Sequence, residues 1–227
     1  MKFAAVLVGL LFAGAAFGQV SAQPATKARI SFTVEQPQLE PAAYSLEIYE
    51  DGSGSYRASY TVSATGDSAP EPVERTVHIH DPLLSKMFRE ARANHFFAFD
   101  CEGRHSRVVF TGKKTLAYSG PDGAGSCTFN YSKEQWVDQL ARGLQAVAYT
   151  LEEGVRLKRE QRYDRLSLDG ELASFQEAVE SGQALEIGNI QPELQSIVRD
   201  GAVMNRARGR ASRLIAGTTV AASRPDK

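Results

Sequence analysis

One apolar stripe constrains the fold of this chain more than any other feature. Between Lys133 and Arg165 no proline interrupts a run of good helix formers, and apolar residues recur at steps of three or four. At about 3.6 residues per turn, this spacing places them on one side of a helix. The sequence therefore predicts a long helix that covers a core with Trp136, Leu140, Leu144, Val147, Leu151 and Val155.

The sequence before this helix predicts mainly β-strands. Apolar and polar residues alternate from Tyr44 to Val62 on both sides of Asp51-Gly52, which is the pattern of a β-hairpin. The remaining expected strands are a weak one at Ile30–Val34, one at Val73–Ile79, a second hairpin of 108–110 and 116–118 around Gly112-Lys113-Lys114, and a last strand with Cys127 and Phe129.

Capping residues and glycines predict the helix ends. Asp81-Pro82 places an N-cap and a first-turn proline before a short helix, and Ser132 can cap the long one. Gly154 is the expected place for a kink or an early end. Further helices are expected at 168–179, 189–201 and 202–215.

The order strands, helix, strands, helix indicates an α+β fold, with an antiparallel sheet of hairpins and helices packed on one face. A C-terminal all-helical segment follows. We expect a signal peptide at 1–22, an α+β domain at 23–155, a helical extension at 156–216 and a disordered tail at 217–227. The next positions on the stripe are the charged Lys158 and Arg162, so the apolar face ends near Val155. We therefore expect Leu157→Ala to lower the free energy of unfolding clearly less than Leu144→Ala or Leu151→Ala.

The first residues have the layout of a secretory signal peptide. Lys2 precedes an apolar run from Phe3 to Phe17, and Val20-Ser21-Ala22 offers small residues for cleavage. A run of about 15 apolar residues is short of the ~20 that span a bilayer. We therefore expect a secreted or periplasmic protein without a transmembrane segment in the mature chain. The formal net charge of −1 gives no indication of nucleic-acid binding.

The only two cysteines are Cys101 and Cys127. An even number in an exported protein favours one disulfide, while two free thiols or a metal pair are the alternatives.

The stretch from about Tyr44 to Val155 resembles uncharacterised secreted bacterial α+β domains of unknown function. The resemblance rests on Tyr44-x-Leu46-x-Ile48 before Asp51-Gly52, a short helix ending in Phe96-Phe97, a second hairpin and a closing helix. It implies an exported α+β domain and no activity.

His78 and His80 are candidates for a metal pair on one face of a strand, with His95, Asp100, Glu102 and His105 available to complete a site. The alternative is an exposed polar sheet face. No serine lies in a Gly-x-Ser-x-Gly elbow, and we expect no cofactor. The carboxylate pairs Glu152-Glu153 and Glu177/Glu180 are interpreted as solvated helix faces.

Arg206, Arg210 and Arg213 project from one side of the last expected helix. Such a helix can bind an anionic surface or an acidic partner. The alternative is an amphipathic helix packed on its neighbours, with its arginines in water.

Together these patterns predict an exported, non-enzymatic binding or interaction module. Its expected partner is an envelope protein or an anionic surface. The alternative is an extracytoplasmic metal-dependent hydrolase that uses a His78/His80 site.

Overall fold

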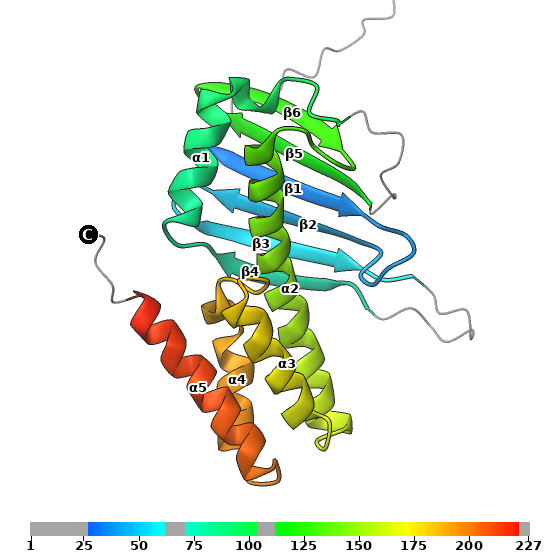
Figure 1. The fold of residues 1–227 in the computed structure, drawn as a ribbon, viewed down its shortest axis with the longest axis vertical. Helices are drawn as coiled ribbons and strands as arrows, with labels where there is room; N and C mark the ends of the chain where they lie inside the picture. The colour runs from blue at the N-terminus through cyan, green and yellow to red at the C-terminus, as the bar shows by residue number, and fades with distance from the viewer. Residues whose placement is uncertain (1–26, 62–70, 104–111, 223–227) are drawn as a thin grey trace, which may run out of the picture.

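A computed structural model describes residues 27–61, 71–103 and 112–222. The expected signal peptide, the expected strand at 108–110 and His105 lie outside these ranges. A six-stranded antiparallel sheet forms the centre, in the order β4-β3-β2-β1-β5-β6 (Figure 1). Its strands are β1 (Arg29–Glu35), β2 (Ala43–Tyr49), β3 (Ser53–Ser59), β4 (Val73–His78), β5 (Lys113–Gly120) and β6 (Gly123–Phe129).

Strand β1, the weakest in the sequence pattern, lies in the middle of the sheet. It pairs with β2 and β5, so that Phe32 stands opposite both Leu46 and Leu116. Ile30, Phe32 and Val34 are fully buried, whereas the residues between them face the other side of the sheet. One face of the sheet is therefore a core face, as in many antiparallel sheets.

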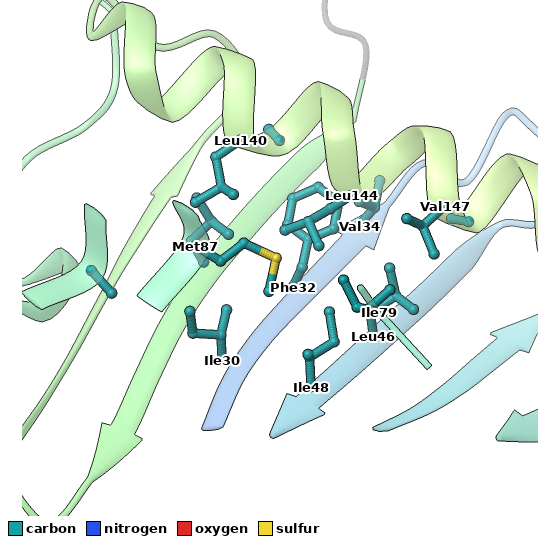
Figure 2. Close-up of a cluster of buried hydrophobic side chains, with 14 of the residues drawn as sticks. Ile30, Phe32, Val34, Leu46, Ile48, Ile79, Met87, Leu140, Leu144 and Val147 are labelled. Carbon is teal, nitrogen blue, oxygen red and sulfur yellow. The ribbon is translucent and has the colours of Figure 1, made fainter. Parts of the chain in front are cut away.

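Helices α1 (Leu83–Ala93) and α2 (Gln135–Tyr163) cover this core face. Figure 2 shows Leu140, Leu144 and Val147 of α2 above the apolar side chains of β1 and β2. All three are buried, as is Leu151, and full burial of such a side chain contributes about 1.5–3 kcal/mol. The expected α+β fold, with helices on one face of an antiparallel sheet, is confirmed.

A second core lies below the β4 edge of the sheet (Figure 1). It is built by α3 (Leu168–Glu180), the 3-10 helix η2 (Ile187–Ile190), α4 (Gln191–Arg199) and α5 (Asn205–Ala222). Helix α2 runs through Gly154 without ending there, and its Leu157 is fully buried in this core. The structure thus contradicts the expected lesser role of Leu157, because α2 leaves one core and enters another.

Several predicted boundaries are wrong. Helix α1 begins at Leu83, and Asp81 Oδ1 accepts a bond from the Ser85 N–H at 3.0 Å. Helix α2 begins at Gln135 rather than after Ser132, whose Oγ accepts from the Glu134 N–H. Lys113 and Lys114 lie within β5, and the hairpin turns at Pro121-Asp122 instead. Helix α5 reaches Ala222, inside the stretch expected to be a disordered tail.

Cys101 and Cys127 form a disulfide, with their Cα atoms 5.9 Å apart. The bond joins the segment after the 3-10 helix η1 (His95–Phe97) to β6, and both cysteines are buried. None of the helices in the described ranges has an apolar stretch long enough to cross a membrane.

Candidate functional site

The two candidate metal ligands, His78 and His80, lie where β4 meets the helical segment. Their ring centroids are 4.5 Å apart at 75°. His80 Nδ1 is 2.7 Å from Glu186 Oε2, and the His80 N–H donates to the other Glu186 oxygen at 2.9 Å. The Asn189 side chain accepts from the His78 N–H at 2.7 Å and donates to the His78 carbonyl at 2.9 Å. These contacts hold η2 against the edge strand β4. The Asn189 side chain satisfies the backbone N–H and carbonyl of His78, which would otherwise be unpaired at the sheet edge.

Of the other candidate ligands, Glu102 is not brought to this place, and His105 lies outside the described ranges. Glu102 accepts a bond from the Asn130 N–H, beyond the end of β6, which is the opposite edge of the sheet from β4. Within the described ranges, no three His, Cys, Asp or Glu side chains are grouped so that they could hold a metal ion. The hydrolase alternative therefore stays a prediction with no added support.

The three candidate arginines of α5 differ in their contacts. Arg206 and Arg210 both pair with Asp169 of α3, at 2.7 and 3.1 Å. Arg213 is exposed. Two of the three thus contribute to the contact between α5 and α3, which favours the interpretation of a packed amphipathic helix.

The outer face of the sheet is polar and locally neutral. Small side chains such as Ser31, Thr33, Ser45, Thr115 and Thr128 point outward from its middle. Its six charged residues pair with each other, as Arg57–Glu74 at 2.9 Å, Arg29–Glu47 at 3.6 Å and Lys113–Glu35 at 3.9 Å. We interpret this face as a solvated surface.

A different surface stands out at the end of the helical segment farthest from the sheet (Figure 1). There Asp200, after α4, accepts from Gln161 of α2 at 3.1 Å and lies 3.6 Å from Arg165. These contacts hold the α2–α3 loop beside the α4–α5 loop. We call the resulting surface the distal tip; it comprises Arg159, Arg162, Tyr163, Arg165, Leu166, Arg199 and Met204.

Large apolar side chains of the distal tip are turned to solvent. Tyr163 is 74% exposed, Leu166 78% and Met204 38%. The Arg162 guanidinium lies 5.2 Å from the centre of the Tyr163 ring. Exposed apolar residues rimmed by charge make this surface a candidate interaction site.

The distal tip is also basic. Residues 158–165 and 199–208 contain seven basic and three acidic residues. Arg165 is paired with Asp200, but within the described ranges Arg159, Arg162 and Arg199 form no ion pair. The charges of Arg162 and Arg199 are therefore open to an anionic partner, whereas Arg159 also interacts with Tyr60 and Glu160.

Glu153 is buried rather than solvated, which corrects the interpretation of the Glu152-Glu153 pair. Its side chain is 1% exposed, and neither carboxylate oxygen has a hydrogen-bond partner in the described ranges. Burial, reinforced by the nearby Glu171 carboxylate and opposed by Arg156, raises the pKa of Glu153 to about 8. Glu152, one position earlier, instead accepts bonds from the Tyr56 and Tyr60 hydroxyls at 2.7 and 2.8 Å.

Comparison with known proteins adds no assignment. No protein-family model matches the chain, and no curated protein is significantly similar to it in sequence. The resemblance to secreted bacterial domains stays a prediction.

Proposed function

We propose that this protein is an exported, non-enzymatic binding module of the bacterial cell envelope that docks on an anionic lipid surface through the distal tip. The observation that carries the proposal is the exposure of Tyr163 and Leu166 beside Arg162 and Arg199, which form no ion pair within the described ranges, whereas Arg165 pairs with Asp200. The signal-peptide pattern of the first residues supports an envelope location.

The composition of the distal tip fits an interface between water and lipid. Tyrosine combines an apolar ring with a polar hydroxyl and favours the headgroup level. Each arginine near an anionic leaflet contributes about 1 kcal/mol, so Arg159, Arg162 and Arg199 would together supply about 3 kcal/mol. Insertion of Leu166 adds apolar burial. We expect weak, reversible binding that salt reduces, because exposed charges are screened.

Vesicle co-sedimentation tests the proposal. The mature protein should bind vesicles of mixed phosphatidylglycerol and phosphatidylcholine at low salt, and should not bind pure phosphatidylcholine. Arg162→Gln should weaken binding roughly fivefold, the equivalent of about 1 kcal/mol. Leu166→Ser should weaken it as well.

Two variants of exposed residues outside the distal tip serve as controls. Leu39 is 55% exposed in the β1–β2 connection, and the Arg89 side chain of α1 is 66% exposed. Leu39→Ser and Arg89→Gln should leave vesicle binding unchanged. Equal losses in the tip and control variants would show that only overall charge and hydropathy matter, and would contradict a site at the distal tip.

A further inference from the structure

Glu153 lies in the contact between α2 and α3, where charged groups from both helices surround it. Tyr149, Arg156 and Glu160 influence it from α2, and Glu171 does so from α3. Next to it, Gly154 contacts Ile190 of η2 and Arg75 of β4. Arg75 is turned away from Glu153, because it donates to the Leu151 carbonyl at 3.3 Å and pairs with Glu193 of α4.

The one nearby cation does not neutralise Glu153. Arg156 Nη1 lies 2.5 Å from Glu171 Oε1 but 3.6 Å from Glu153 Oε2. With all groups ionised, Glu153 and Glu171 would share the Arg156 guanidinium, and Glu160 would add a third negative charge nearby. An ionised carboxylate that is buried without a hydrogen bond is strongly unfavourable. When protonated, Glu153 can instead donate a hydrogen bond to the neighbouring Glu171 carboxylate.

We propose that the α2–α3 contact is a pH-sensitive switch, closed while the buried Glu153 is protonated and loosened when Glu153 is ionised beside Glu171. It is independent of the proposed lipid binding. We expect its consequence to be local, because α3 is also held by the apolar second core and by the Asp169 pairs with α5. Loss of the proton places two negative charges in this contact with one arginine between them.

The direction of the pH dependence follows from the raised pKa of Glu153. In the unfolded chain a glutamate releases its proton near about pH 4.3. The folded protein retains the proton to higher pH, so the stabilisation is complete below the unfolded value. It is lost as the pH rises through the folded value. Between the two values, the equilibrium constant for unfolding should rise by about tenfold per pH unit for one retained proton.

Chemical denaturation from about pH 5 to about pH 9, a range that includes the Glu153 pKa of about 8, tests the switch together with hydrogen exchange of the α3 amides. Exchange in α3 should accelerate at alkaline pH in the wild type beyond the base-catalysed rise of the intrinsic rate, so that the protection factors of these amides fall. Glu153→Gln, which mimics the protonated acid, should remove this acceleration. Glu177→Gln changes an exposed acid of α3 and should retain the acceleration.

Side-chain carbon NMR of the wild type provides a readout that needs no variant. The Glu153 carboxyl carbon should titrate well above the exposed glutamates. A Glu153 midpoint in the ordinary range of glutamate would overturn the proposal. So would alkaline acceleration that persists unchanged in folded Glu153→Gln.

Discussion

At the scale of single residues, Leu157 and Gly154 decide how one helix serves two cores. Leu157 lies outside the apolar stripe that runs from Trp136 to Val155, so periodicity alone places it away from the first core. It nevertheless packs with the residues of α3, α4 and α5. The stripe predicts the face that meets the sheet, but it carries no information about a second set of partners on another face.

Leu157→Ala should destabilise the protein about as much as Leu151→Ala. Both side chains are fully buried, and removing such a leucine costs about 2–5 kcal/mol. Urea denaturation of the two variants measures the costs, with exposed Leu166→Ala as a control near zero. A cost at Leu157 as small as that at Leu166 would show that the second core contributes little.

Gly154→Ala should also be destabilising, although alanine favours helices. A Cβ at this position would lie 2.5 Å from Ile190 Cγ2 and 2.8 Å from Arg75 Nη1. We expect overpacking to cost about 1–3 kcal/mol. Gly170→Ala in α3 is the matched control, because a Cβ there meets nothing within 4 Å, and it should gain up to about 1 kcal/mol. A stabilised Gly154→Ala variant would contradict this close approach of η2 and β4.

At the scale of elements, the sequence patterns predicted the hairpin and the helix that depend on residues close together in the chain. The Asp51-Gly52 hairpin and the long helix α2 appear where alternation and periodicity placed them. The central position of β1 was not predictable, because strand pairing depends on residues far apart in the chain. The left-handed turn at His95–Phe97 was not predictable from the sequence either. Its Phe96 stacks on Tyr118 and its Phe97 on Trp136, contacts that local sequence does not reveal.

The disulfide ties this turn to β6 and should contribute to global stability. The bond closes a loop with a sequence separation of 26, worth about 3.5 kcal/mol in the chain-entropy model. The double variant Cys101→Ser with Cys127→Ser should lose about this amount in urea denaturation. Thiol titration of the denatured, unreduced wild type should find no free sulfhydryl. Two free sulfhydryls per chain would contradict the bond.

At the scale of the whole molecule, the sequence predicted a basic C-terminal surface but not its position. Helical periodicity grouped Arg206, Arg210 and Arg213, yet it could not show that Asp169 of α3 pairs with two of them. The distal tip joins residues about 40 positions apart, from the α2–α3 and α4–α5 loops, and only the tertiary fold unites them. Tyr163 and Leu166 are apolar residues within a basic stretch, and their exposure is a property of the folded chain that the sequence does not give.

The direct test of the proposed function places a fluorescent reporter at the distal tip. Tyr163→Trp adds an indole at a 74% exposed position, whereas the native Trp136 is packed against the first core. On addition of phosphatidylglycerol vesicles at low salt, its emission should shift to the blue and return on addition of salt, because tryptophan favours the lipid interface. Tyr131→Trp, outside the distal tip, should show no shift. An unchanged spectrum of folded Tyr163→Trp at saturating lipid would contradict docking through the distal tip.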